Sequence, residues 1–344
     1  MRHAVLFFLL VFPALGQDQA RGPASDKAQK SYKEGLQAIG HGDPFLALDK
    51  FKHADKQDGG KCFACQSQIM KYAMMTGDWK AAEAAASETL SQAQGNREQA
   101  IAHYNLGMIL MNESRARRKD DLLEQVHAEM AQALSLYPKF PSAYFIDGEA
   151  LARTKQDDAA KIQFEKFVAM VQDDDADRGR ALRFIAEPDL ARARMAPAFM
   201  ITTLDGQRVS LDGFQGKVVL LDFWATWCGP CRAALPHMQE LAKKFHGQPL
   251  VILSVSLDND EQKWKDFVTK NEMTWLQYRD GGFKGPIASL FGVEAIPQTF
   301  TIDADGVLQD QHIGDASLEG KIKKLVARVR ESQIAEKPPL QTSP

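Results

Sequence analysis

The stretch Val218-Val-Leu-Leu-Asp222-Phe-Trp-Ala-Thr-Trp227-Cys228-Gly-Pro-Cys231 places two thiols directly after a run of apolar residues. A short continuous apolar run is typical of a strand that is buried on both faces of a sheet. The residues after Cys231 have the spacing of an amphipathic helix. The sequence therefore predicts a strand, a turn and a helix, with the cysteine pair at the turn.

The first turn of a helix carries unpaired N–H groups and the positive end of the helix dipole, and both stabilise a thiolate. Cys228 holds this position, so it is the predicted nucleophile toward disulfides, because the thiolate is the attacking species. Cys231 lies inside the predicted helix and is expected to attack the mixed disulfide and release the substrate. The alternatives are a static disulfide or half of a zinc site. Zinc takes about four ligands, and no second Cys pair or Cys/His cluster lies nearby in the sequence, so we expect no metal.

Asp222-Phe-Trp-Ala followed by Trp-Cys-Gly-Pro-Cys is similar to the active-site signature of the thioredoxin family. Upstream, Ala196-Pro-Ala-Phe, Asp205-Gly206 and Gly216-Lys217 resemble the exported TlpA/ResA-like branch of that family. The resemblance covers residues 196–330. It implies a thioredoxin fold and an enzyme, a thiol-disulfide oxidoreductase with a redox-active Cys228–Cys231 disulfide and no cofactor. Its partners would be protein disulfide substrates and an upstream thiol electron donor.

The resemblance also implies which residues contact the substrate, namely Trp227, Gly229, Pro230, Ile296 and Pro297. In the family, the matching proline is cis and faces the cysteines, so that the backbone of the preceding residue can pair with an extended substrate. A proline at the start of a strand is otherwise an ordinary feature. The Gly-Pro between the cysteines resembles that of reducing thioredoxins, which favours a reductase over a disulfide oxidase or isomerase.

Asp222 belongs to the strand that is predicted to be buried. A buried carboxylate is costly unless it is protonated or partnered, so we expect a raised pKa for Asp222 and a role as proton acceptor for Cys231. The alternative is an Asp at the strand end that reaches solvent or caps a turn. The TlpA/ResA-like pattern commonly has Asn here and Glu three residues after the second cysteine, where this chain has Ala234. This departure disfavours a dedicated role in cytochrome c assembly.

The N-terminal half, residues 25–173, is rich in Ala, Lys, Gln and Leu and is punctuated about every 34 residues, the period of tetratricopeptide repeats (TPR). Gly35 and Phe51 lie at the offsets of the packing residues of such repeats, and Gly148 and Phe164 recur in register. We interpret this half as a TPR-like all-α solenoid whose groove binds a peptide or protein. An irregular helical bundle is the alternative.

A second pair, Cys62 and Cys65, lies within this half. A haem attachment motif would need His after the second Cys, where Gln66 stands. Residues three apart in a helix have Cβ atoms roughly 5–6 Å apart, beyond the ~3.5–4.5 Å of a disulfide, so a Cys62–Cys65 disulfide requires Cys62 at or before the helix cap. Two buried thiols, a structural disulfide and a second redox centre all remain open.

Residues 1–16 combine a basic start, an apolar run and small residues at Ala14 and Gly16, the pattern of a signal peptide cut before Gln17. The apolar run is far shorter than the roughly 20 residues that span a bilayer. We expect a periplasmic or secreted protein, which would be tethered to the membrane if the signal were left uncleaved.

The remaining segments are a helical connector, residues 174–195, and a disordered tail, residues 331–344. The net charge of −3 and the ordinary charged fraction do not indicate nucleic-acid binding. The expected fold class is therefore multidomain, an all-α solenoid followed by an α/β thioredoxin fold. A TPR scaffold with a non-catalytic thioredoxin-like domain is the competing interpretation. A peroxidase of the peroxiredoxin kind would need a Thr-x-x-Cys site, which the sequence lacks.

Overall fold

The computed structural model describes residues 22–313 and 318–335. The predicted signal peptide and residues 336–344 of the predicted tail lie outside this range. The prediction that the chain is disordered from residue 331 onward is wrong, because helix α13 (Glu319–Ala335) continues to Ala335. Residues 331–335 contain no Gly or Pro to end the helix. Within the described ranges, no helix combines the length and the apolarity needed to cross a bilayer.

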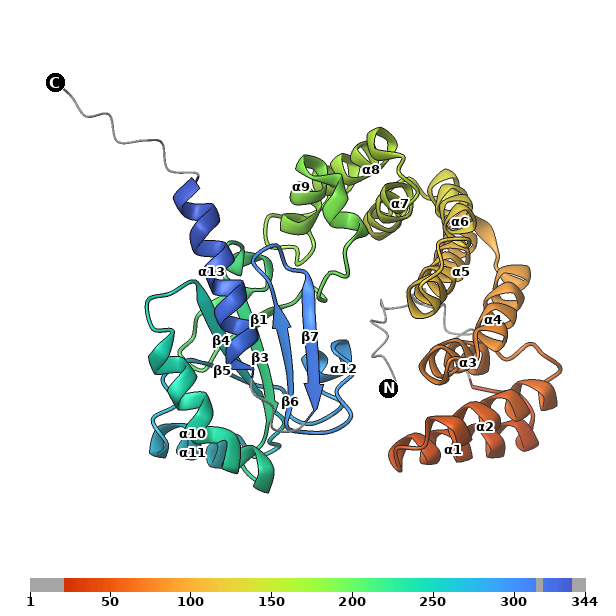
Figure 1. Ribbon diagram of the computed structural model, residues 1–344. Helices are drawn as coiled ribbons and strands as arrows, with labels where there is room; N and C mark the ends of the chain where they lie inside the picture. The colour runs from red at the N-terminus through yellow and green to blue at the C-terminus, as the bar shows by residue number, and fades with distance from the viewer. Residues whose placement is uncertain (1–21, 314–317, 336–344) are drawn as a thin grey trace. The chain divides into compact units, whose positions relative to one another are not determined.

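The N-terminal half is built of helices that pack against their neighbours in sequence, α1 on α2, α3 on α4, α5 on α6 and α7 on α8 (Figure 1). They are α1 (Asp26–Gly40), α2 (Pro44–Gln57), α3 (Phe63–Thr76), α4 (Trp79–Gln92), α5 (Gly95–Arg117), α6 (Leu123–Leu136), α7 (Pro141–Arg153) and α8 (Asp157–Met170). Successive pairs also contact each other through α2 and α3, α4 and α5, and α6 and α7. The result is a row of helical hairpins.

Short polar side chains begin several of these helices. The carboxylate of Asp43 accepts a hydrogen bond from the backbone N–H of Leu46, and that of Asp78 accepts one from Ala81. Gly77 ends α3 with φ of 75°, a left-handed conformation that glycine adopts without steric cost. The Gly77-Asp78 pair therefore forms the tight turn between α3 and α4.

Two glycines let the helices of a hairpin approach closely. A Cβ on Gly35 would lie 2.7 Å from the ring of Phe51, and a Cβ on Gly148 would lie 2.7 Å from the ring of Phe164. Both phenylalanines are fully buried. The same small-against-aromatic contact therefore recurs in the first and the last hairpin.

The chain divides into two compact units, and the predicted connector is shared between them. Residues 184–192 belong to the helical unit, whereas 173–183 belong to the α/β unit. The connector contains α9 (Arg178–Ala186) and the 3-10 helix η1 (Pro188–Arg192). In the helical unit, Phe184 is buried with its ring 5.3 Å from that of Phe164.

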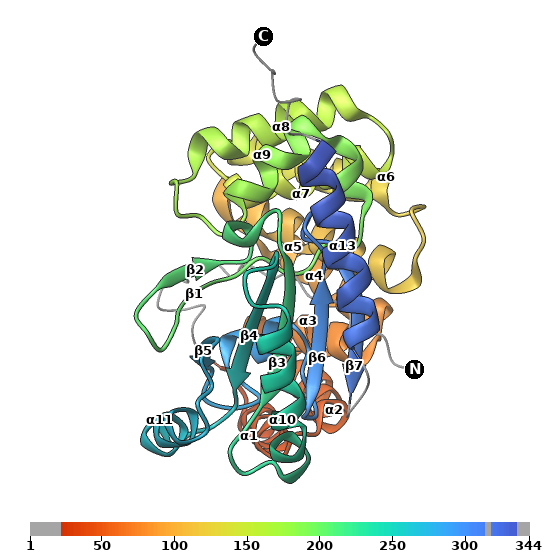
Figure 2. The ribbon, with the colours of Figure 1, turned by 60° about the vertical axis from the view of Figure 1, so that its left-hand side comes forward.

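The α/β unit contains a five-stranded mixed sheet in the order β5-β4-β3-β6-β7 (Figure 2). The strands are β3 (Val218–Trp224), β4 (Leu250–Ser256), β5 (Leu276–Arg279), β6 (Gln298–Ile302) and β7 (Leu308–Ile313). On one side of β3, β4 is parallel to β3 and β5 is parallel to β4. On the other side, β6 is antiparallel to β3 and β7 is antiparallel to β6. A separate hairpin of β1 (Met200–Thr202) and β2 (Arg208–Ser210) precedes the sheet. The predicted order, an all-α half followed by an α/β thioredoxin fold, is confirmed.

The central strand β3 is buried along its whole length, and its side chains alternate between the two faces of the sheet. Val218 and Leu220 pack with α10 (Gly229–Lys244) and α13 in one apolar cluster. Leu221 and Phe223 belong to the other cluster, in which the Phe223 ring lies 5.9 Å from that of Phe291. Asp222 continues the alternation of Val218 and Leu220, so it faces the side of the sheet that α10 covers.

The remaining helices of this unit are short and lie between the strands in sequence. They are η2 (Asp212–Phe214), α11 (Glu261–Lys270) and α12 (Pro286–Leu290). Helix α12 begins where the carboxylate of Asp280 accepts hydrogen bonds from the N–H groups of Ile287 and Ala288. Asp280 therefore anchors the segment between β5 and α12.

Candidate active site

Cys228 and Cys231 form a disulfide where β3 passes into α10. Cys228 is the N-cap residue of α10, and its Sγ accepts a hydrogen bond of 3.2 Å from the backbone N–H of Cys231. Pro230 lies in the first turn of the helix, where its missing N–H costs nothing. Because Cys228 lies at the helix N-terminus, a negative charge on its sulfur is stabilised there.

The second cysteine-facing segment is Ile296-Pro297, whose peptide bond is cis. The carbonyl oxygen of Ile296 lies 3.9 Å from the Sγ of Cys228. Pro297 is buried and directly precedes β6, the antiparallel neighbour of β3. The fold thus brings residues 228 and 296 together although they are far apart in the sequence.

Three residues that adjoin Cys228 and Cys231 in the sequence are exposed to solvent. Trp227 is 58% exposed, and Gly229 and Pro230 are exposed as well. The Trp227 ring lies 6.5 Å from the ring of Phe283, which is 40% exposed. Phe283 was not predictable from the sequence, because it lies between β5 and α12 in a loop without a recognisable motif. Together these side chains offer an apolar surface beside the disulfide.

Asp222 is buried in β3, with only 9% of its surface exposed. Burial raises the pKa of its carboxyl group to about 6, although a hydrogen bond from Ser254 works in the opposite direction. A carboxyl group with this pKa changes protonation state near neutral pH, as a general acid or base must.

The hydroxyl of Ser254 donates this hydrogen bond to Asp222 Oδ2 at 3.0 Å. In turn, the indole Nε1–H of Trp275 donates to Ser254 Oγ at 2.8 Å. Ser254 lies directly beside Asp222 in the β3–β4 ladder and is fully buried. Neither partner was predictable from the sequence, because a Ser in a strand and a Trp before a strand carry no signal of their own.

A second buried carboxylate, Asp258, holds the loop that carries the cysteines. Its Oδ2 accepts a hydrogen bond of 2.9 Å from the backbone N–H of Thr226, and its Oδ1 accepts one of 2.6 Å from the Thr226 hydroxyl. The Ser256 hydroxyl also donates to Asp258 Oδ2, at 2.7 Å. Asp258 thereby ties the residues just before Cys228 to the end of β4. This contact has no signature in the sequence.

The helix terminus, the cysteine pair and a poised carboxyl group are the parts that thiol–disulfide exchange needs, namely a stabilised thiolate, a second thiol and a proton acceptor. The residues that the sequence analysis selected in this unit lie at the junction of β3 and α10, within β3, and in the segment before β6. Cys62 and Cys65 lie in the helical unit, where they form a disulfide of their own.

Several known proteins are similar in sequence to part of this chain. Residues 193–311 match the AhpC/TSA family. The thiol-disulfide oxidoreductase ResA of Bacillus thuringiensis (strain Al Hakam) is 36% identical over 133 residues, which are 38% of this chain and 76% of the relative. The thioredoxin-like protein YneN of Bacillus subtilis (strain 168) is 34% identical over 142 residues, which are 40% of this chain and 81% of the relative.

Solved structures are also similar to part of this chain. One is the C-terminal domain of a thiol-disulfide oxidoreductase from Bacteroides thetaiotaomicron, with 27% identity, a TM-score of 0.37, and coverage of 40% of this chain and 96% of that one. Another is a thiol:disulfide interchange protein DsbE from Chlorobium tepidum, with 31% identity, a TM-score of 0.36, and coverage of 40% and 96%.

The match to ResA extends over about three quarters of that relative at 36% identity. Through its α/β unit, this chain belongs to the ResA-like thiol-disulfide oxidoreductases of the thioredoxin fold.

Proposed function

We propose that this protein reduces disulfide bonds of exported proteins, with Cys228 as nucleophile and Cys231 as resolving cysteine. The Cys228 thiolate attacks one sulfur of the substrate disulfide, whose other sulfur leaves as a thiolate. Asp222 then accepts the proton of the Cys231 thiol, and the Cys231 thiolate attacks Cys228 Sγ. The substrate leaves with two reduced sulfurs, and the enzyme is left with the Cys228–Cys231 disulfide.

The observation that carries this proposal is the position of Cys228 at the N-terminus of α10, bonded to Cys231 and next to the carbonyl of Ile296. An upstream dithiol must reduce the enzyme again after each turnover. The apolar side chains of Trp227 and Phe283 would contact a protein substrate, and the Ile296 backbone would pair with its extended chain.

Reduction of insulin disulfides with dithiothreitol as electron donor tests the proposal. The complete protein should accelerate precipitation of the insulin B chain, and Cys228→Ser should not. A scaffold with a non-catalytic thioredoxin-like domain predicts no acceleration by either protein, and that result would reject the enzyme. A disulfide oxidase or isomerase would instead re-form or rearrange disulfides in reduced or scrambled ribonuclease.

For the helical unit we propose a TPR-like array whose groove binds a substrate or partner protein. The recurring contacts of Gly35 with Phe51 and Gly148 with Phe164 support this. The test uses a shortened chain that begins at residue 173. It carries Phe184→Ser, because Phe184 loses its burial when the helical unit is removed. This chain should still reduce insulin. In cells it should form mixed disulfides with fewer proteins than the complete chain does. Loss of insulin reduction would instead assign the helical unit a part in the active site.

The same proposal places the protein outside the cytoplasm, on the basis of the predicted signal peptide. Fractionation of cells, with detection of the protein and determination of its N-terminal residue, tests this. Recovery in the cytoplasm with Met1 intact would contradict export.

A further inference from the structure

We propose that Cys62–Cys65 is a second redox-active disulfide, which exchanges electrons with a dithiol presented by another protein at the cavity beside α3. Cys62 is the N-cap residue of α3, and its Sγ accepts a hydrogen bond of 3.1 Å from the backbone N–H of Cys65. The equivalent distance in the Cys228–Cys231 site is 3.2 Å. Both pairs therefore place their first sulfur where a helix N-terminus stabilises a thiolate.

Burial does not separate the two disulfides. Cys62 and Cys65 are 3% and 0% exposed, compared with 5% and 6% for Cys228 and Cys231. The apolar cluster around Cys62 and Cys65 is small, with Ala54 as its other fully buried member. A disulfide that closes so short a loop restricts the unfolded chain less than one that closes a long loop, so its contribution to stability is small.

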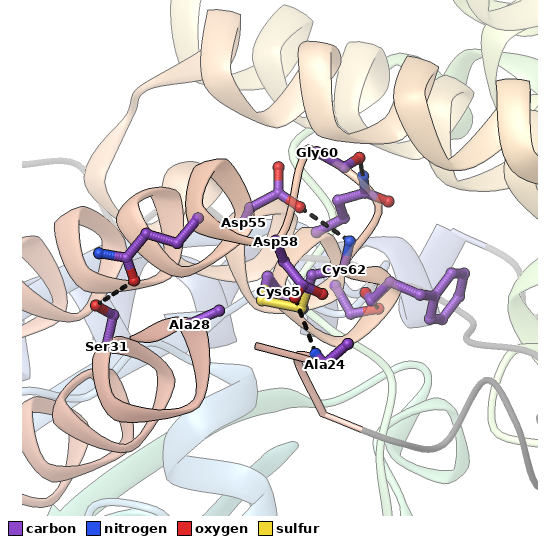
Figure 3. Close-up of a disulfide and its surroundings, with 12 residues drawn as sticks. Ala24, Ala28, Ser31, Asp55, Asp58, Gly60, Cys62 and Cys65 are labelled. Carbon is purple, nitrogen blue, oxygen red and sulfur yellow. Dashed lines mark hydrogen bonds between the residues drawn. A yellow bond between two sulfur atoms is a disulfide. The ribbon is translucent and has the colours of Figure 1, made fainter. Parts of the chain in front are cut away.

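A carboxyl group accompanies this pair as well. Asp55, on α2, has an oxygen within 4.8 Å of both sulfurs. Its Oδ1 accepts a hydrogen bond of 3.2 Å from the backbone N–H of Cys62, and Figure 3 shows the carboxylate directed at the cysteine loop. Burial raises the pKa of Asp55, and the negative charges of Glu88 and Asp58 raise it further, whereas the Cys62 N–H lowers it. Asp55 is thus placed to exchange a proton with a thiol of the pair.

The cavity makes the two sulfurs unequal. It has a volume of about 1210 Å³, and its wall includes Cys62 and Phe63 together with Tyr32, Lys61 and Gln92. Of the two cysteines, Cys62 alone is among the described residues that line it. The volume exceeds the roughly 300–1,000 Å³ of pockets for small molecules, so we assign this cavity as the side from which the Cys-x-x-Cys dithiol of a protein approaches Cys62.

The electron transfer follows from this asymmetry. A thiolate of the partner attacks Cys62 Sγ, the Cys62–Cys65 bond breaks, and Cys65 leaves as a thiolate that takes the proton of the Asp55 carboxyl group. The second thiol of the partner then attacks its own sulfur in the mixed disulfide and releases Cys62 as a thiolate. The partner dithiol is oxidised to a disulfide, and Cys62 and Cys65 receive two electrons.

The first test uses the complete protein with Cys228→Ser and Cys231→Ser, in which Cys62–Cys65 is the remaining disulfide. Under native conditions, dithiothreitol should reduce it at a rate within about tenfold of that for Cys228–Cys231 in a Cys62→Ser, Cys65→Ser protein. Alkylation with a maleimide and mass spectrometry measure both rates. Reduction more than about a thousandfold slower, which follows the unfolding rate as denaturant is added, would show a structural disulfide and overturn the proposal. The Cys228→Ser, Cys231→Ser protein lacks the cysteines on which the insulin assay depends, so this outcome is independent of the proposed function.

The second test assigns the roles of the two cysteines in the same background. With Cys65→Ser, the remaining Cys62 should react with the aromatic disulfide 5,5′-dithiobis(2-nitrobenzoate). With Cys62→Ser, the remaining Cys65 should not. Equal reaction of both would contradict the assignment of Cys62 as the attacked sulfur. Circular dichroism of each variant verifies that it is folded.

The third test separates proton transfer from a structural role of Asp55. Asp55→Asn keeps an oxygen that accepts the Cys62 N–H but removes the proton acceptor. It should slow closure of a preformed Cys62 mixed disulfide by about tenfold or more at neutral pH, and the remaining rise of the rate with pH should follow ionisation of the Cys65 thiol alone. Asp58→Asn is the control, because it removes one neighbouring charge. In Asp58→Asn, the rate of closure plotted against pH should move to lower pH, because the charge of Asp58 raises the pKa of Asp55, and the maximum rate should be unchanged. Equal profiles for Asp55→Asn and the parent would refute the role of Asp55.

Discussion

The Ser254 hydroxyl donates a hydrogen bond to Asp222 Oδ2 at 3.0 Å, in the middle of the buried sheet. Ser254 itself receives a hydrogen bond from the indole of Trp275. The Asp222 carboxyl group therefore has a partner, but one neutral donor does not offset the cost of burying its charge, since its pKa is raised to about 6. The arrangement keeps a titratable group in the core at the expense of stability.

Asp222→Asn should make the fold more stable at neutral pH and slow release of the Cys228 mixed disulfide. The ordinary pKa of 3.8 is raised to about 6 in the folded protein, which corresponds to about 3 kcal/mol. As pH rises from about 4 through about 6, stability should therefore fall by about 3 kcal/mol more in the parent than in the variant. Denaturant midpoints against pH, with stopped-flow kinetics of both half-reactions, measure this. Lower stability with unchanged release would make Asp222 a structural residue.

Ser254→Ala should raise the pKa of Asp222 further, because the Ser254 hydrogen bond lowers it. The variant also leaves the N–H of the partly buried Trp275 without this acceptor, at a cost of about 1 kcal/mol. Carboxyl carbon NMR shifts of Asp222 report the pKa directly. Ser256→Ala is the matched control, since Ser256 lies on the same strand and donates to Asp258. An equal shift in both variants would show a general effect of strand disruption.

Cys231→Ser should trap mixed disulfides with protein substrates, whereas Cys228→Ser should trap none. Without Cys231 the intermediate on Cys228 cannot be resolved, and without Cys228 it does not form. Non-reducing electrophoresis and mass spectrometry of the purified complexes measure the trapping. Equal amounts from both variants would contradict the two roles.

Asp258→Ala should destabilise the α/β unit by about 3 kcal/mol, because it leaves the Thr226 N–H and two hydroxyls without their acceptor. It should also slow the attack of Cys228 on a small aromatic disulfide, since the loop before the cysteine loses its anchor. Thr226→Val is the control, because it removes one hydroxyl and keeps the backbone hydrogen bond, with an expected cost of about 1 kcal/mol. Denaturant midpoints that fall equally in both variants would show that the Asp258 carboxylate adds nothing beyond the Thr226 hydroxyl.

The sequence alone was enough to predict an α/β unit after an all-helical half, because these features depend on local patterns, and the resemblance of the cysteine motif to the thioredoxin family implied the particular fold. The apolar run of β3, the cysteines at the start of a helix and the helical spacing of the N-terminal half each involve residues close together in the chain. The extent of α13 was misjudged, because the tail was predicted to be disordered from residue 331 and the helix continues to Ala335.

The partners of the buried polar groups were decided by tertiary structure. Ser254 meets Asp222 because β4 lies beside β3 in one particular register, and Asp258 meets Thr226 at the end of the same strands. For Cys62 and Cys65 the sequence left three alternatives. The position of Cys62 at the N-cap allows the disulfide to form, and the packing of α2 beside α3 brings Asp55 to it. Such pairings depend on strand register and helix packing over long separations in the chain, which a local pattern of residues does not specify.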